Sequence, residues 1–371
     1  MALVSGVAGP ASAGGGTVSQ APAVSFPASV SSSGWRTGHV QGVAVDRTRG
    51  FIYYSFTALL VKTDVTGRLV GTLGGFTGHL GDLAIDERDG RIYGSLEYKA
   101  ADAFYVAIID GTRLDRVGLD VTSSTLVRAV HLAEVVADYT ADMNGDGRFD
   151  GNTGDTPDHR YGCSGIDGVS FGPRFGETAG RTYLTVAYGV YANVDRRDND
   201  HQVLLQYDAS SWWETYAQPL DQAALHRRGP AAHDGKYFVY TGNTTYGVQN
   251  LEYDAHTQRW LLGVYRGRKQ GFPNYTLFAV DAAAQPTRGP LTGTGDEGLR
   301  LPLAAAGRRD DATGIRGWHQ KADVGLVSLG DGRFYLAVDS VRDGLQGAEL
   351  TLSRWTGDPD APFVPASDAQ R

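Results

Sequence analysis

Short apolar stretches, separated by turns rich in glycine and aspartate, recur along most of the chain. Residues 39–54 read HVQGVAVDRTRGFIYY, and residues 79–94, which begin 40 positions later, read HLGDLAIDERDGRIYG. Each copy begins with an apolar run, passes through a turn bearing Asp and Gly, and resumes with β-branched and aromatic residues. That pattern predicts two strands joined by a tight turn. Two further short apolar runs, at 58–64 and 68–75, predict a third and a fourth strand.

Four short strands in about 40 residues is the size of one β-propeller blade. Weaker copies follow, so that blade starts are expected near 39, 79, 164, 247 and 320. We therefore predict an all-β fold, a β-propeller with five clear blades. The gaps of 85, 83 and 73 residues between later starts leave room for six or seven. The segment 23–30 is expected to pair with the last blade and close the ring, because closure removes exposed strand edges.

Two segments inside the gaps carry additional apolar patterns. Residues 235–242, GKYFVYTG, predict a strand, whereas residues 126–136, LVRAVHLAEVV, fit either a strand or a short helix.

The motif G-V-A-V-D-x₃-G-x-I-Y at 42–53, followed by V-K-T-D-x-x-G at 61–67, resembles NHL-type and gluconolactonase-type propeller repeats. The likeness covers about 80 residues well and another 60 loosely. It implies the fold, whereas propellers of this kind host lactonases, phosphotriesterases, glycosidases, polysaccharide lyases and plain binding platforms. The gluconolactonase type holds calcium on the axis with Glu, Asn and Asp side chains. This implies a second divalent metal at the axis, with Asn250 and Asp82 or Asp167 as counterparts.

Composition and charge argue against several classes of protein. The chain has 371 residues, of which 50 are Gly and one is Cys, and its formal net charge is −8. A single cysteine excludes an internal disulfide framework. The acidic balance disfavours a general nucleic-acid binder. Since no apolar stretch approaches 18 residues, no membrane span is expected.

Three regions are expected along the chain. Residues 1–22 are either a signal-like segment, with an A-x-A pattern at Ala11-Ser12-Ala13, or a flexible tail. The signal-like start favours a secreted or periplasmic protein. Residues 23–360 form a single propeller domain with an inserted calcium loop near 137–160, and residues 361–371 form a flexible C-terminal tail.

The sequence DMNGDGRFD at 142–150 has the spacing of a calcium loop. Calcium needs about six to eight oxygen ligands, and alternate side chains of a D-x-N-x-D-G loop fold inward around it. Position 12 of the loop is Thr153 instead of Glu, so that a further carboxylate is expected from Asp155 or Asp158. The expected role is to brace the loop, and the alternative is a surface turn without metal. The predicted ligands are Asp142, Asn144, Asp146, Asp150 and, through its backbone carbonyl, Arg148.

The inner strands of a propeller start on one face, where the loops between the second and third strands also open. Side chains that gather there are the default candidates for a site. Histidines can act as general bases, and paired carboxyl groups as acid and base across a glycosidic bond. The alternative for each is a strand cap or a turn residue. The catalytic candidates are His39, His79, Asp82, Asp167, Tyr188 and His319.

The same face offers groups suited to holding a substrate. Cationic side chains bind carboxylate, sulfate or phosphate groups, and flat aromatic rings suit sugar rings. The alternatives are a solvated charged loop and aromatic core packing. The substrate-binding candidates are Glu97, Gln249, Asn250, Arg266, Lys269 and Trp318.

These features favour a secreted carbohydrate-active enzyme that cleaves a glycosidic bond in an oligosaccharide or polysaccharide, by hydrolysis or by uronate-type elimination from an anionic substrate. Two alternatives remain open: a metal-dependent lactonase or phosphotriesterase, and a propeller that binds glycan without catalysis.

Overall fold

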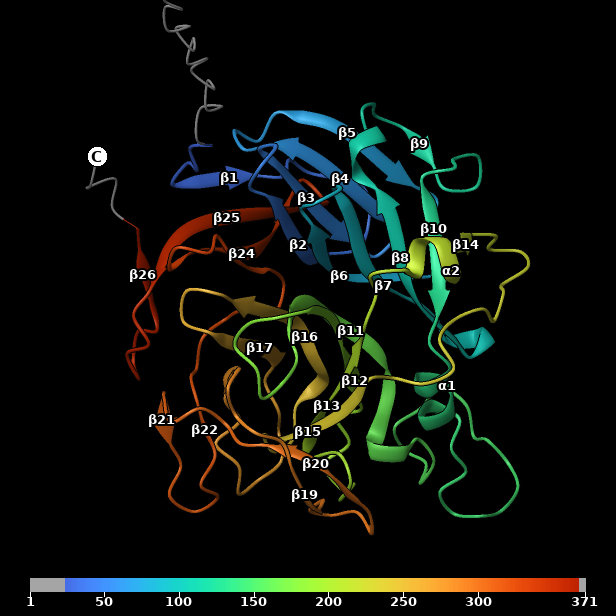
Figure 1. The fold of residues 1–371 in the computed structure, drawn as a ribbon, viewed down its shortest axis with the longest axis vertical. Helices are drawn as coiled ribbons and strands as arrows, with labels where there is room; N and C mark the ends of the chain where they lie inside the picture. Colours follow the sequence, from blue (N-terminus) through green and yellow to red (C-terminus); the bar gives the residue numbers. More distant parts are fainter. Residues whose placement is uncertain (1–23, 367–371) are drawn as a thin grey trace, which may run out of the picture.

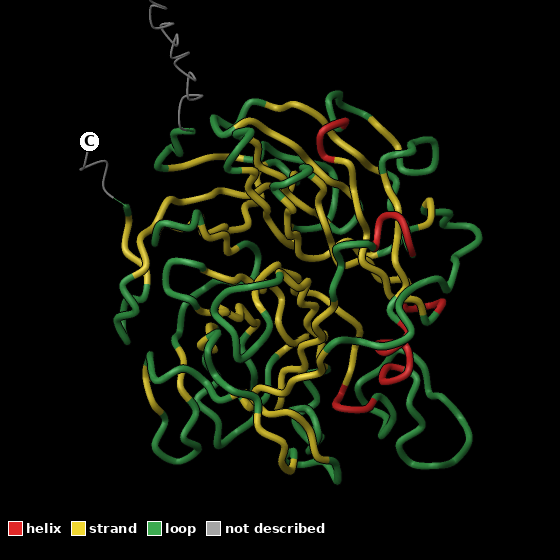
Figure 2. Tube along the Cα trace, in the orientation of Figure 1, coloured by secondary structure: helices red, strands yellow, loops and turns green. Residues whose placement is uncertain are grey.

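The computed structural model describes residues 24–366, and the signal-like segment 1–22 lies outside the described residues. Strands dominate the chain and the helices are short (Figure 2). Five sheets follow one another around an axis, from the blue strands through green and yellow to the red ones (Figure 1). Their inner strands contact one another in the order β2, β6, β11, β16, β23 and back to β2. The predicted five-bladed propeller is therefore confirmed.

Each blade is built outward from an inner strand, with successive strands antiparallel. The inner strands are β2 (Val40–Asp46), β6 (His79–Asp86), β11 (Cys163–Pro173), β16 (Thr245–Asp254) and β23 (Leu326–Ser328). The second strands are β3 (Phe51–Phe56), β7 (Arg91–Tyr98), β12 (Thr182–Val190), β17 (Arg259–Tyr265) and β24 (Arg333–Arg342). The third strands are β4 (Leu59–Asp64), β8 (Ala103–Asp110), β13 (His201–Tyr207), β18 (Leu277–Asp281) and β25 (Leu345–Trp355).

The outer edges of the blades are completed by chain that comes later in the sequence. Fourth strands of the first three blades are β5 (Leu69–Gly74), β10 (Val127–His131) and β15 (Gly235–Tyr240). Strand β9 (Leu119–Asp120) lies between the third and fourth strands of the second blade in sequence but pairs with β5 of the first blade. Likewise, β14 (Gln218–Pro219) lies between the third and fourth strands of the third blade but pairs with β10 of the second. Strands β19 (Thr287–Pro290) and β20 (Glu297–Leu301) follow the fourth blade but extend the third through β15. Each of the first three blades is therefore completed by a strand from the chain that belongs to, or follows, the next blade.

The last blade is closed by both ends of the described chain. Strand β1 (Ser29–Ser31) and strand β26 (Phe363–Pro365) pair with the same edge of β25. The predicted N-terminal closure is thus observed. Residues 363–365, which the sequence placed in a flexible tail, form part of the blade. A small hairpin, β21 (Arg308–Arg309) and β22 (Arg316–Gly317), precedes β23, and Trp318 beside it bridges to Leu277 of the fourth blade.

The helices lie in the connections between strands. Segment 126–136 combines both predicted possibilities, since β10 is followed at once by α1 (Ala133–Tyr139). The remaining helical segments are α2 (Trp212–Thr215), η1 (Lys99–Ala101), η2 (Gly111–Arg113) and η3 (Arg160–Gly162). Within residues 24–366, no helix is both long and apolar enough to cross a membrane.

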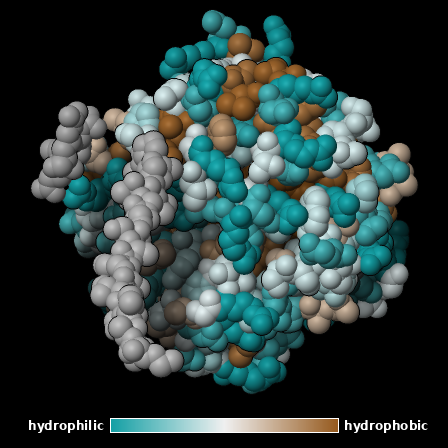
Figure 3. All heavy atoms as spheres, turned by 45° about the horizontal axis from the view of Figure 1, so that its top comes forward, coloured by the Kyte–Doolittle hydropathy of each residue, from teal (hydrophilic) through white to brown (hydrophobic). Residues whose placement is uncertain are grey.

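The core is divided among the interfaces between blades. Five clusters of buried apolar residues each join two neighbouring sheets, as when Leu73 of the first blade packs with Leu80 of the second. Strand β2 is buried along its whole length because blades cover both of its faces. Hydrophilic residues cover much of the outer face seen in Figure 3, with apolar residues showing between them.

Candidate active site

A pocket of about 760 Å³ opens at the end of the axis where the inner strands begin. Its size is that of a small-molecule site. The polar lining comes mainly from the first residues of inner strands and the last residues of second strands, as the sequence predicts. It includes His39, Gln41, His79, Glu97, Lys99, Ser164, Asp167, Gln249 and the tyrosines Tyr98, Tyr191, Tyr246 and Tyr265.

Four ionisable groups meet on one wall of this pocket. His79 begins β6 and Glu97 ends β7, and the register of the two strands places them directly opposite each other. Nδ1 of His79 lies 3.4 Å from Oε2 of Glu97, and Nζ of Lys99 lies 3.3 Å from the same oxygen. The backbone N–H of Ile166 donates to Oε1 of Glu97 at 2.6 Å. All sides of the Glu97 carboxylate are therefore engaged, and it holds His79 and Lys99 in position.

The fourth group, Asp167, reaches the pocket through an irregularity in β11. The pairing of β11 with β12 shifts between Ile166 and Val169, and such a bulge redirects side chains. Asp167 accepts a 2.9 Å hydrogen bond from Nε2 of Gln249, which belongs to the fourth blade. The site thus combines inner strands of three blades.

Burial and the neighbouring charges shift the pKa values of three groups in this cluster. Burial raises the pKa of Asp167 to about 7, although His79 opposes the shift. Burial would lower the pKa of His79, but its hydrogen bond to Glu97 and the charge of Asp167 raise it above its usual value. Burial would raise the pKa of Glu97, yet Lys99 and His79 hold it below its ordinary range. Near neutral pH, Glu97 is ionised and Asp167 changes protonation, while His79 keeps its proton to higher pH than a free imidazole does.

Gly165 makes room for this arrangement. Its φ is +123°, and a Cβ at this position would collide with Oε1 of Glu97. We expect Gly165→Ala to displace the Glu97 carboxylate and with it His79. Backbone strain alone should lower the free energy of unfolding by about 1–3 kcal/mol, and the collision with Glu97 should add to that loss. The matched control is Gly118→Ala, where φ is +82° and nothing lies within 4 Å of the added Cβ. Urea unfolding of both variants gives the comparison, and an equal loss in both would contradict a specific role for Gly165.

His39, just before β2, also lines the pocket. Its Nε2 is 3.2 Å from the hydroxyl of Tyr265 and 3.3 Å from Nε2 of Gln41. Burial lowers its pKa, although Asp339 opposes the shift. His39 is therefore a neutral polar contact for a ligand at pH 7. The three predicted histidines do not form one cluster, since only His39 and His79 line the pocket.

Asp82 and Asn250 lie deeper on the axis, outside the pocket lining. Oδ2 of Asp82 accepts the backbone N–H groups of Val169 and Leu251, each at 3.0 Å, and Oδ1 accepts Nδ2 of Asn250 at 3.1 Å. Asn250 also donates to the carbonyl of Gln41 at 2.8 Å. These bonds connect the inner strands of four blades, so that both residues help to hold the blades together around the axis. Asn250 turns its nitrogen, not its oxygen, toward Asp82.

Five other predicted residues are placed away from the pocket. Tyr188 is fully buried and donates to Asp138 at 2.8 Å. His319 is exposed and stacks on Tyr275. The remaining three are Arg266, which is exposed, Lys269, which pairs with Asp200 at 2.6 Å, and Trp318, which is buried and donates to the carbonyl of Asp358.

Long connections supply lining residues that the repeat pattern does not reveal. Asn152, from the acidic loop, accepts a 2.5 Å hydrogen bond from Tyr191. Gln222, from the connection after β14, accepts from the hydroxyl of Tyr98 and the backbone of Thr77 and donates to the carbonyl of Gly75, each at 2.8 Å. Lys99 comes directly after the end of β7 and two residues after Glu97. Its position next to a second strand could have predicted that it lines the pocket.

The acidic loop at 142–158 is closed by its own hydrogen bonds. Asp142 accepts the backbone N–H groups of residues 145–147, and Asp158 accepts those of Met143 and Asp150. Among the residues described, no three His, Cys, Asp or Glu side chains lie close enough to share a metal ion. Calcium at Asp142, Asn144, Asp146, Arg148 and Asp150 stays a prediction.

We expect added calcium to raise the thermal stability of the protein through this loop. At a concentration of about ten times its Kd, the ion would add about 1.4 kcal/mol to the free energy of unfolding. Differential scanning calorimetry with calcium and with a chelator measures the effect. Asp146→Asn should reduce it, while the exposed Asp311→Asn should not. An identical response to calcium in both variants would remove the loop from consideration.

Comparison with known proteins does not assign this chain to a family. No family model and no curated protein matches the chain. The resemblance to NHL-type and gluconolactonase-type repeats therefore stays a prediction.

Solved structures similar to this chain differ widely in function. They include a Kuenenia stuttgartiensis hydrazine synthase, at 9% identity and TM-score 0.32 over 89% of this chain and 70% of that chain. The Cps50 (Swd1) β-propeller domain of Myceliophteria thermophila shows 11% identity and TM-score 0.34, with 90% and 87% covered. The Dos1 propeller shows 9% identity and TM-score 0.32, with 90% and 85% covered. Likeness at this level transfers no function.

Proposed function

We propose that this protein is an enzyme that cleaves a glycosidic bond in an oligosaccharide or polysaccharide within the axial pocket. The observation that carries the proposal is the cluster of His79, Glu97, Lys99 and Asp167 in one pocket wall. The pKa of Asp167 is raised to about 7 and that of His79 is raised above its ordinary value, which suits an acid and a base acting together. The four tyrosines of the lining offer flat apolar faces with polar edges, suited to sugar rings.

Each group has a role that its contacts support. Glu97 fixes the Nδ1 side of His79, which leaves Nε2 free to accept a proton, as in other carboxylate–imidazole pairs. Asp167, when protonated, donates to the leaving oxygen of the scissile bond. Lys99 adds a positive charge beside the reacting centre. Glu97 is therefore a positioning residue, while His79 and Asp167 form the acid–base pair.

Two routes use the same pair. In hydrolysis, His79 removes a proton from the attacking water while Asp167 protonates the leaving oxygen. In elimination from a uronate, His79 removes the proton at C5, the C5–H electrons form the new double bond, and the C4–O bond breaks with protonation by Asp167. Lys99 would then face the substrate carboxylate, which is the role that we predicted for Arg266 and Lys269.

A substrate screen tests the proposal. Purified protein is incubated with neutral and acidic glycans, and both reducing ends and the ultraviolet absorbance of unsaturated uronates are followed. Reducing ends without absorbance indicate hydrolysis, and both together indicate elimination. Glycan binding without any product would favour the binding platform, and products from lactones or phosphotriesters alone would favour the other alternative.

We expect a bell-shaped dependence of kcat/KM on pH, with Asp167 titrating at about 7 and the other limb set by the raised pKa of His79. Below the optimum, His79 and Asp167 are both protonated, so that no base remains; above it both are deprotonated, so that no acid remains. Only the intermediate state, with one proton shared between the two, is active. Initial rates between pH 4 and 10 give the profile, and a rate that rises steadily into alkaline solution would contradict this pair.

A further inference from the structure

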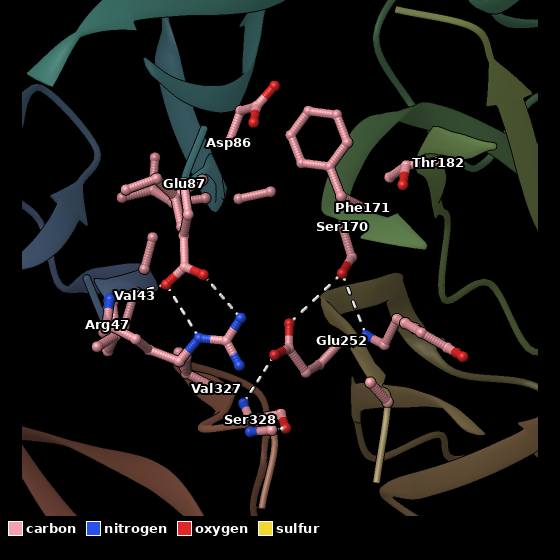
Figure 4. A pocket seen from close by; sticks show the side chains of 18 of the residues that line it. Val43, Arg47, Asp86, Glu87, Ser170, Phe171, Thr182, Glu252, Val327 and Ser328 are labelled. Atoms are coloured by element: carbon pink, nitrogen blue, oxygen red, sulfur yellow. Dashed lines mark hydrogen bonds and ion pairs between the residues drawn. The ribbon is translucent and has the colours of Figure 1, made fainter. Parts of the chain in front are cut away.

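A second pocket, of about 330 Å³, opens at the opposite end of the axis (Figure 4). It is lined by the final residues of the inner strands, so that all five blades contribute to its wall. The apolar part of the lining comes from Val43, Val45, Leu83, Ile85, Phe171 and Val327. Neither the repeat pattern nor the proposed reaction accounts for this pocket.

One carboxyl group projects into this space. Oε1 of Glu252 accepts the backbone N–H of Ser328 at 2.7 Å, whereas Oε2 has only the hydroxyl of Ser170 at a long 3.4 Å. Figure 4 shows the Glu252 side chain between Ser170 and Ser328, with the guanidinium of Arg47 beside it on the side of Glu87. Burial raises the pKa of Glu252 to about 8, although Ser328 and Arg47 oppose the shift. Oε2 is therefore short of a donor.

The other charges of the lining are already paired. Nε and Nη2 of Arg47 donate to Glu87 at 2.9 and 2.8 Å, and Arg88 donates twice to Asp86, at 2.8 and 2.5 Å. Among the described residues that line this pocket, two arginines are thus paired with two carboxylates. Glu252 has no ion pair of its own, although the charge of Arg47 acts on it. Behind the wall, Asp254 accepts from Thr257. An ionised Glu252 would leave a net charge of −1 in the pocket.

We propose that this pocket binds a small organic ammonium ion, with the nitrogen on Oε2 of Glu252 and the carbon chain against the apolar wall. An ammonium group brings the missing positive charge and has three N–H donors. Oε2 of Glu252 and Oγ of Ser170 are acceptors within reach of one nitrogen, since they lie 3.4 Å apart. A metal ion fits less well, because Asp86 and Glu87 are committed to arginines and one carboxyl cannot supply six oxygen ligands.

Calorimetric titration with n-butylammonium chloride tests the proposal, with sodium chloride as the ionic control and 1-butanol as the uncharged analogue. We expect saturable binding of the ammonium ion, at least about tenfold weaker binding of butanol, and a loss of at least about tenfold in Glu252→Gln. The matched control is Asp331→Asn, at a carboxylate that pairs with Arg333 outside the pocket. Equal binding of butanol, unchanged affinity in Glu252→Gln, or no saturable binding would each overturn the proposal.

A measurement on the unaltered protein covers the case in which Glu252→Gln does not fold. Because Glu252 is mainly protonated at pH 7 and must ionise to pair with the cation, binding should release nearly one proton. Titrations in two buffers with different ionisation enthalpies count that proton. Binding without proton release would place the ammonium ion elsewhere. Neither result depends on the reaction in the other pocket, so that the two proposals stand or fall separately.

Discussion

Asp167→Asn is expected to lower kcat at least about 100-fold while leaving the fold intact, because an amide cannot donate the proton that the leaving oxygen needs. The substituted side chain can still accept the hydrogen bond of Gln249, which is 2.9 Å from the carboxyl in the native protein. Asparagine also removes one of the two titrating groups. The pH profile should therefore lose one of its two limbs, in addition to the lower maximal rate. Steady-state rates across pH measure both effects.

The control for this variant is Asp281→Asn, at a half-exposed carboxylate on β18 that pairs with Arg259 of β17. It should retain full activity. Circular dichroism and the midpoint of unfolding check that Asp167→Asn is folded. A folded variant with native kcat and an unchanged profile would exclude Asp167 as the acid.

Asp82→Ala should be the most destabilising single substitution on the axis. Its carboxyl accepts two backbone N–H groups and the amide of Asn250, all of them buried. Removing the acceptor leaves the two backbone donors without a partner, because Asn250 can still donate to the carbonyls of Gln41 and Gln249. Each such loss costs about 1–3 kcal/mol. We expect the free energy of unfolding to fall by at least about 2 kcal/mol, as measured by urea denaturation.

Asp310→Ala is the comparison for that loss. Asp310 accepts the backbone N–H and the hydroxyl of Thr313 in a solvent-accessible turn, where water replaces the lost bonds. Its effect should be much smaller. Equal losses in the two variants would show that the axial bonds of Asp82 contribute no more than those of an ordinary surface turn.

The propeller was predictable from the sequence because the residues that form each pair of inner and second strands are close together in the chain. Each inner strand and its turn lie within 16 residues, as at 39–54 and 79–94, so that alternating apolar runs and Asp-Gly turns indicate them directly. The exchanged edge strands were not predictable, since β9, β14 and β20 pair with chain far away in the sequence. Two-residue strands such as β9 carry no periodic pattern.

The site was predictable where strand register determined it. His79 and Glu97 face each other because a tight turn fixes the pairing of β6 with β7. His319 was misplaced on the axis because β23 begins only at Leu326, and Trp318 pairs instead with the edge of the fourth blade. Lys269 turns toward Asp200 of the third blade, a contact between distant loops.

The exchange of edge strands sets an order for the folding of the chain during synthesis. The first three blades lack complete hydrogen bonding until β9, β14 and β20, which lie beyond them in the chain, have been made. The last blade must in turn pair with β1, the first strand of the described residues. During synthesis each unfinished blade therefore presents an uncovered strand edge, which is the kind of surface that favours aggregation. The edge of β25 is covered only when β1 and β26 pair with it, so that the ring closes in a late step.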